Sequence, residues 1–467
     1  MNTTNHINRR RFIAQASCAG ISCAPFFSTL LNLSLTGRVA ADSPSIGKDY
    51  RALVCIFLTG GIDSFNMLAP RSGTAYDEYK ASRQFIAHAC EDLLPVGTSQ
   101  PNHPELGLHP QLPQLKALFD AGKLAFVSNV GALVRPITLQ EYKNHIAVPN
   151  SVFAHDTQQE QWMTCIPKSN VEYGWGGRAA DILRDQNMGA KVSMNISLSG
   201  NNLFQYGRKV VPYAITDMGS VALKSFDPHE KATPFETVAV NSMLEQQYKS
   251  LFKQTYVDAM RTALGADQVF SSIIEPISLK TVFPNTQVGR DLHMVARTIA
   301  GREAIGAKRQ TFFVEKGGWD THSNVVGIQK EHLPDIDNAV AAFMSAMEEI
   351  GASNQVTLFS ASEFGRTLSY NPGGGGGGSD HAWGGNHFVV GGAVKGGAIY
   401  GQYPSLALNT NLDTGQGRLI PTMSVDAYSA ELARWFGVSD TDLSTVFPNL
   451  GSFYSPSSGK PPVGFMS

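Results

Sequence analysis

The chain is poor in charged residues and has no excess of positive charge. Of its 467 residues only 16% are charged, with 39 acidic against 37 basic side chains. A nucleic-acid-binding protein would carry a marked excess of lysine and arginine, so we expect no nucleic-acid partner. The hydrophobic fraction of 42% is enough for a large buried core, which excludes general disorder.

Common catalytic signatures are absent as well. The sequence contains no Gly-x-x-x-x-Gly-Lys-Ser/Thr phosphate loop, no Gly-x-Ser-x-Gly nucleophile turn and no His-Glu-x-x-His zinc helix. This argues against P-loop nucleotide enzymes, serine esterases and common metalloproteases. Cysteine is scarce, with no Cys-x-x-Cys pair. Cys55 lies in an apolar run and is interpreted as a small buried hydrophobe. A disulfide between Cys90 and Cys165 would suit an oxidising compartment, but their spacing does not require one.

The N-terminus has the features of an export signal. Residues 9–13 read Arg-Arg-Arg-Phe-Ile, the twin-arginine pattern, and precede a weakly apolar stretch without acidic residues. Val39-Ala40-Ala41 resembles a cleavage site, so we predict a signal peptide over residues 1–41 and a mature chain from Asp42. Polar and small residues interrupt the stretch, which makes it a poor membrane anchor. We therefore expect a periplasmic or secreted protein, exported by the twin-arginine translocase and without a membrane span after processing.

The mature chain is predicted to form one α/β domain over residues 42–467. Neither a repeat nor a Pro/Ser-rich linker divides it. Short apolar runs typical of buried parallel strands lie at 53–58, 124–128, 311–314 and 356–360. Helical periodicity is clearest at 111–121, 234–264, 292–302, 328–350 and 425–436. This alternation predicts a mostly parallel central sheet with helices on both faces.

Acidic side chains follow three of these predicted strands. Asp63 and Asp320 each come shortly after a glycine pair, and Glu363 follows the third strand. The carboxyl ends of parallel strands meet at one edge of a sheet, so the three carboxylates can converge there and bind a divalent cation. The alternative is that each acid is an ordinary turn or helix-capping residue.

Histidines accompany these acids. His322 lies two residues after Asp320, His381 follows Asp380, and His387 comes shortly afterwards. Mixed nitrogen and oxygen donors suit zinc or manganese better than calcium. Six glycines, 373–378, precede this segment, and they are interpreted either as a solvated insertion or as a flap beside the site.

Several motifs together resemble a known family. They are Arg9-Arg10-x-Phe12, Gly60-Gly61-x-Asp63, Gly318-Trp319-Asp320-Thr321-His322, Ser362-Glu363-Phe364-Gly365-Arg366-Thr367, Asp380-His381-Ala382-Trp383-Gly384 and Gly391-Gly392-Ala393-Val394-Lys395-Gly396-Gly397. The chain is similar in these to an uncharacterised exported bacterial family, a domain of unknown function grouped with the alkaline phosphatase and sulfatase superfamily. The resemblance implies an alkaline-phosphatase-like sheet with one or two divalent metals at the strand ends.

The resemblance also implies roles for individual residues. Asp63 would ligate metal beside the nucleophile, while Asp320 and His322 would belong to one metal site. His387, or else His381, would supply that site's later histidine. Glu363 stands where the superfamily usually has an Asp-His pair, and Phe364 takes the histidine position. Asp380 with His381 is the other candidate for that pair.

The nucleophile is the point at which the chain departs from the family pattern. The superfamily places a hydroxyl or modified cysteine at a helix N-terminus, and the matching region here is 151–159. Ala154 stands before His155, where the family often has serine. Thr157 or Ser151 takes the role, or a metal-bound hydroxide attacks directly, or the protein is not a hydrolase of this type.

The sequence therefore supports two hypotheses about function. The first is an exported metal-dependent hydrolase of a small anionic phosphate or sulfate ester. Its catalytic candidates are Thr157, His155 and Arg366, the last either as an anion clamp or as an ordinary salt-bridged arginine. The second is a non-catalytic exported binding or assembly protein that keeps the fold.

Overall fold

The computed structural model describes residues 49–97, 103–168, 171–220, 242–244, 246, 251–372 and 376–467. Side chains of 251–256 and 258–263 are not included in this description. The predicted signal peptide lies outside these residues. Within them, no helix is both long enough and apolar enough to cross a membrane.

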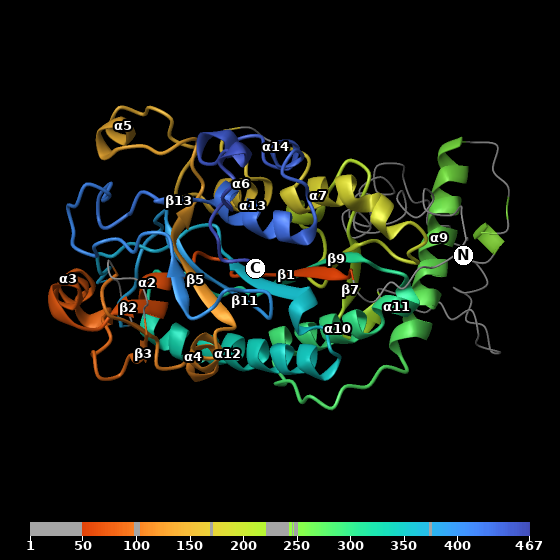
Figure 1. Ribbon diagram of the computed structural model, residues 1–467, viewed down its shortest axis with the longest axis horizontal. Coiled ribbons are helices and arrows are strands. Elements are labelled where there is room, and N and C mark those ends of the chain that lie inside the picture. Colours follow the sequence, from red (N-terminus) through yellow and green to blue (C-terminus); the bar gives the residue numbers. More distant parts are fainter. Residues whose placement is uncertain are drawn as a thin grey trace, which may run out of the picture.

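A ten-stranded sheet runs through the middle of the described part of the chain (Figure 1). Its order is β12 (Ala398–Tyr400), β5 (Leu124–Gly131), β11 (Gly385–Gly391), β10 (Val356–Ala361), β1 (Arg51–Phe57), β9 (Arg309–Glu315), β6 (Asn195–Ser197), β7 (Tyr213–Thr216) and β8 (Gly219–Ser220), with β13 (Met423–Ser424) paired to β5. A second sheet joins β2 (Leu68–Pro70), β4 (Leu106–Leu108) and β3 (Leu94–Val96).

The centre of the large sheet is parallel. Strand β1 pairs in parallel with β9 on one side and β10 on the other, so that Phe57 lies beside both Glu315 and Ala361. Residues 52–57 of β1 are buried, which explains its continuous apolar sequence. The four predicted strands are confirmed as β1, β5, β9 and β10. The prediction did not include β11, which is antiparallel to both neighbours.

Helices cover both faces of the sheet (Figure 1). On one face lie α6 (His155–Thr164), α7 (Trp175–Leu183), α13 (Val425–Phe436) and α14 (Leu443–Val446), and on the other lie α4 (Pro113–Asp120), α10 (Gln287–Ala300) and α12 (Val325–Glu349). The predicted mostly parallel α/β fold is confirmed. The helix predicted over 234–264 corresponds to α9 (Leu251–Ile274), and most of 234–250 lies outside the described residues.

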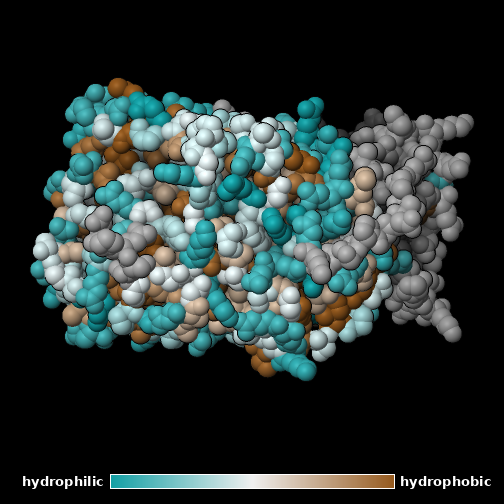
Figure 2. All heavy atoms as spheres, viewed as in Figure 1, coloured by the Kyte–Doolittle hydropathy of each residue, from teal (hydrophilic) through white to brown (hydrophobic). Residues whose placement is uncertain are grey.

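Four more α-helices lie within the described residues. They are α2 (Ser64–Met67), α3 (Gly73–Arg83), α5 (Leu139–Lys143) and α11 (Arg302–Ile305). On the face drawn in Figure 2, apolar side chains form separate groups among polar ones. Such a mixed surface is ordinary for a globular protein.

The three cysteines of the described chain are free thiols. The sulfur of Cys90 lies 3.2 Å from a carboxylate oxygen of Glu91, whereas Cys165 is buried against the main chain of Trp162 and Val425. The disulfide considered between Cys90 and Cys165 is therefore not formed. Burial also raises the pKa of Cys165, as expected for an unreactive core thiol.

Candidate metal centre

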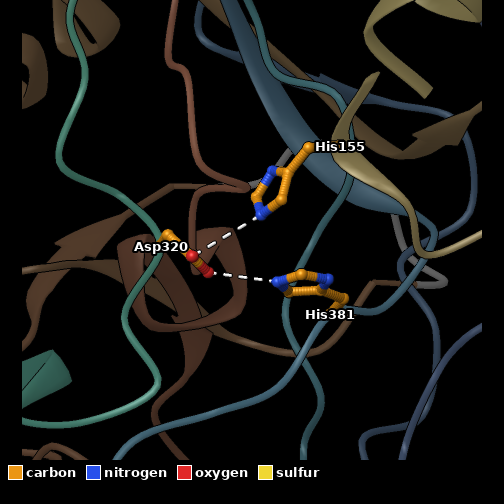
Figure 3. Close-up of side chains that lie close together, drawn as sticks. All are labelled: His155, Asp320 and His381. Carbon is orange, nitrogen blue, oxygen red and sulfur yellow. Dashed lines mark hydrogen bonds and ion pairs between the residues drawn. The ribbon is translucent and has the colours of Figure 1, made fainter. Parts of the chain in front are cut away.

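Three imidazoles converge on one carboxylate at the carboxyl edge of the parallel strands. The Nε2 atoms of His322 and His381 each lie 3.1 Å from Oδ1 of Asp320, and Nε2 of His155 lies 3.6 Å from Oδ2. Figure 3 shows His155 and His381 pointing at Asp320 from two sides. Ligand atoms of these three residues all lie within 4.8 Å of one another. This spacing suits ligands of one ion.

The strand register explains why these residues meet. Asp320 follows β9 and Glu363 follows β10, the two parallel neighbours of β1. At Gly60, just after β1, a Cβ atom would lie 2.4 Å from the main-chain nitrogen of Asp320. At Gly61 it would lie 2.2 Å from the ring of Phe364. Both glycines also have positive φ, so the loop after β1 requires glycine to approach the site.

In each of the three imidazoles, Nδ1, the nitrogen on the side away from Asp320, lies beside a hydrogen-bond acceptor. Nδ1 of His155 lies 2.8 Å from Oε1 of Glu363, and Nδ1 of His322 lies 2.9 Å from Oδ1 of Asp380. Nδ1 of His381 lies 2.8 Å from the carbonyl oxygen of Phe153. A carbonyl or ionised carboxylate oxygen can only accept, so these contacts hold the proton on Nδ1 and leave a lone pair on Nε2.

A positive charge between these side chains would stabilise them. Nε2 of His322 and Nε2 of His381 are only 3.0 Å apart, and two such lone pairs repel each other. Partial burial lowers the pKa of His381, which disfavours protonation as the remedy. Three imidazoles and one carboxylate form the donor set of a zinc site. The residues therefore fit a divalent metal ion.

The centre is open to solvent. The side chains of Asp320 and His322 are 48% and 47% exposed. The described end of the glycine loop lies directly beside it, because a Cβ on Gly378 would lie 2.1 Å from the main-chain carbonyl of His322. An anion from solution can therefore reach the centre. Of the two interpretations given to the glycines, the position of Gly378 matches a segment beside the site.

Glu363 lies behind His155 and does not face the centre. Its Oε1 also accepts hydrogen bonds from the main-chain nitrogen of Gly60 at 2.8 Å and from Nε2 of Gln159 at 3.1 Å. It is fully buried. The structure thus places Glu363, predicted as a direct ligand, where it orients an imidazole. Asp380 has the same relation to His322.

Arg366 is buried and forms an ion pair with Asp320. Its guanidinium donates to Oδ1 of Asp320 at 2.9 Å and to the carbonyl oxygens of Gly60 and Ser379. Partial burial of Asp320 raises its pKa, but hydrogen bonds and nearby charges, with Arg366 foremost, outweigh this and lower it. Of the two roles considered for Arg366, the geometry matches the salt-bridged arginine and leaves it poorly placed to clamp an anion.

The structure does not bring Asp63 and His387 to the centre. Asp63 forms a buried ion pair with Arg83. His387 lies within β11, packed against Trp162 with 4.7 Å between ring centroids, and burial lowers its pKa to about 3. His387, expected as a metal ligand, thus lies inside the central strand 385–391.

Thr157 and Ser151 also lie apart from the three imidazoles. Both line a cavity of about 280 Å³, together with Asn150, Asp156, Glu160, Gln161, Ile166 and Pro167. On α6, positions 155 and 159 face Glu363, and position 157 is about 200° further round the helix. Ala154 is the N-cap of α6 and provides no side-chain hydrogen bond. The predicted nucleophile Thr157 therefore faces away from the centre.

Sequence reasoning missed the role of Phe153. Its carbonyl orients His381, and its backbone has a φ of 75°, unusual for a residue other than glycine. Ser151 nearby has a φ of 41°. Backbone strain of this kind concentrates at functional sites. The sequence carries no signal for this role, because every residue has a main-chain carbonyl group.

The chain belongs to a family of proteins of unknown function, DUF1501, whose model matches residues 50–416. This agrees with the resemblance found in the sequence. No curated protein sequence matches the chain significantly.

Three solved structures illustrate the likeness. PsFucS1 sulfatase from Pseudoalteromonas sp. is 10% identical, covers 89% of this chain and 72% of its own, and has a TM-score of 0.32. Phosphonate monoester hydrolase SpPMH from Silicibacter pomeroyi is 8% identical, with 83% and 73% covered and a TM-score of 0.33. The C-terminal periplasmic domain of EcEptC from Escherichia coli, in complex with zinc, is 10% identical, with 75% and 74% covered and a TM-score of 0.30. TM-scores this low carry no argument about activity.

Proposed function

We propose that the protein is an exported hydrolase of phosphate or sulfate esters that depends on a divalent metal ion, with zinc favoured over manganese by its three imidazoles. The observation that supports this most is the convergence of three Nε2 lone pairs on Asp320, each imidazole being oriented through Nδ1. Such orientation of ligands by outer acceptors is typical of metal sites. A small anionic ester is the proposed substrate.

The residues of the centre have distinct tasks in this proposal. His155, His322, His381 and Asp320 would hold the ion, which when bound polarises an ester oxygen and lowers the pKa of a water molecule. Arg366 keeps Asp320 ionised and in place. Glu363 and Asp380 fix the directions of two imidazoles. The ring of Phe364, whose centroid lies 4.8 Å from that of His155 and 4.7 Å from that of His381, walls the centre on one side.

The test is hydrolysis by the purified mature chain loaded with zinc or manganese. p-Nitrophenyl phosphate, bis(p-nitrophenyl) phosphate and p-nitrophenyl sulfate cover the three ester types. We expect turnover of at least one and its loss in Asp320→Asn, which keeps the shape of the side chain. The matched control is Asp335→Asn, an acid on α12 that contacts Lys316 instead of the centre. Equal activity of Asp320→Asn and wild type would contradict the proposal.

Export by the twin-arginine translocase is part of the same proposal, and it rests on the sequence of residues 1–41. Replacing Arg9 and Arg10 by lysine is expected to leave the unprocessed chain inside the cell. Fractionation with immunodetection measures this. Normal processing of the double variant would contradict twin-arginine export.

Ala154 favours the second candidate, a binding protein that keeps the centre without turnover. No hydroxyl stands at this N-cap, and the hydroxyl of Thr157 faces the separate cavity. A protein that binds the ion but hydrolyses none of the three esters would support this candidate over the hydrolase.

A further inference from the structure

We infer that the centre is built for one metal ion, because a fixed guanidinium takes the place beside Asp63 that a second cation would need. The inference rests on the proposed function for the first ion and goes beyond it in the number of ions. It starts from the ion pair between Asp63 and Arg83, whose side chains are 1% and 0% exposed. Asp63 is one of the three strand-end acids, yet its charge is already neutralised.

Arg83 cannot swing aside without losing several hydrogen bonds. Besides its contact with Asp63, it donates from Nε to Oδ1 of Asn66 at 3.2 Å and from Nη1 to the carbonyl oxygen of Thr367 at 2.6 Å. Oδ1 of Asn66 also accepts from the hydroxyl of Tyr79 at 2.9 Å. The guanidinium is thus a fixed part of the buried structure.

The charges of the centre and of the Asp63–Arg83 pair together balance with one divalent ion. Four carboxylates take part, Asp63, Asp320, Glu363 and Asp380, and two guanidiniums, Arg83 and Arg366. Two negative charges therefore remain when the imidazoles are neutral, and one divalent ion cancels them. A second ion beside Asp63 would add excess positive charge next to the buried guanidinium of Arg83, which is unfavourable. Arg418 contacts none of these carboxylates; it binds the main-chain carbonyl of His381.

One atom makes Asp63 the right residue to test. Its Oδ1 is buried and has no hydrogen-bond partner among the described residues. A second ion near β1 would have to use this oxygen. Replacing Asp63 with asparagine keeps the side-chain shape and removes the charge. The variant therefore tests whether Asp63 is a metal ligand or only the ion-pair partner of Arg83.

The experiment measures the number of ions bound. Mature protein stripped with a chelator is titrated with zinc chloride, and separately with manganese chloride, by calorimetry, followed by gel filtration and elemental analysis. We expect one ion per chain. Asp63→Asn should keep that one ion and lose less affinity than Asp320→Asn, because Asp63 does not contact the ligands and only the charge balance around them changes. Asp320→Asn should weaken binding by more than the roughly 100-fold that loss of an outer contact costs.

Each result decides between the possibilities. Two ions per chain, whether or not Asp63→Asn loses one, would overturn the inference and leave the proposed function standing. If no ion binds, both this inference and the proposed function are contradicted. If Asp63→Asn does not fold, the double variant Asp63→Leu with Arg83→Met removes both buried charges, a change that proteins often tolerate. That variant should still bind one ion.

Discussion

Replacing Glu363 with glutamine is the sharpest test of how the centre is organised. Glutamine keeps the oxygen that accepts from Gly60, His155 and Gln159, and its amide can donate to the hydroxyl of Ser362, 3.2 Å from the other carboxylate oxygen. The shape and most hydrogen bonds therefore survive, while the negative charge behind the imidazole is lost. The change isolates the carboxylate's effect on a metal ligand.

The expected effect follows from the position of the carboxylate. Mutation of the carboxylate behind a ligating imidazole typically costs about 10- to 100-fold in metal affinity. This corresponds to about 1.4 to 2.7 kcal/mol of binding free energy. A direct ligand, the role predicted for Glu363 from the sequence, would cost considerably more. The size of the loss therefore separates the two positions.

The assay is zinc binding in competition with a chromophoric chelator, with circular dichroism and thermal unfolding as checks on the fold. The matched control is Glu315→Gln at the end of strand β9, where the carboxylate accepts from the hydroxyl of Thr59. This control should bind zinc as wild type does. Unchanged affinity in Glu363→Gln would refute the orienting role, and complete loss of binding in a folded protein would restore the ligand role.

Three further predictions concern other parts of the chain. Thr157→Val should leave the rate of ester hydrolysis within about threefold of wild type, whereas loss of a nucleophile lowers it by orders of magnitude. Removal of metal with a chelator should abolish hydrolysis and zinc should restore it; undiminished activity of metal-free protein would exclude metal dependence. Burial raises the pKa of Asp426 to about 8. The folded state therefore keeps a proton that the unfolded state releases, and stability should fall by up to about 1.4 kcal/mol per pH unit between about pH 4 and 8. Asp426→Asn should remove this part of the slope in urea unfolding at several pH values, and an unchanged slope would show that the carboxyl group is already ionised.

The fold was largely accessible from the sequence. Strands β1, β9 and β10 are buried on both faces and read as continuous apolar runs, so their pattern is unambiguous. Strand β11 was missed because glycines at both ends and a histidine in its middle are typical of a loop. His387, expected as a metal ligand, lies within this strand and is buried.

The candidate site was only partly accessible. The spacing of Asp320 and His322 after a strand, and the pair Asp380 and His381, selected residues whose side chains meet in space. Spacing cannot tell which of two nearby groups faces an ion and which stands behind it. This is why Glu363 and Asp380 were taken for ligands, although both hold imidazoles.

What the sequence determined by itself is the local chemistry: apolar runs long enough to be buried strands, acids placed after them, and glycines where the loops approach closely. These depend on neighbouring residues and on the period of the side chains. The tertiary structure decided everything that depends on partners distant in the chain. It paired Arg83 with Asp63, turned Thr157 away from the centre on α6, and aimed the carbonyl of Phe153 at His381. Such contacts depend on how elements pack and on backbone angles, for which a linear pattern has no signal.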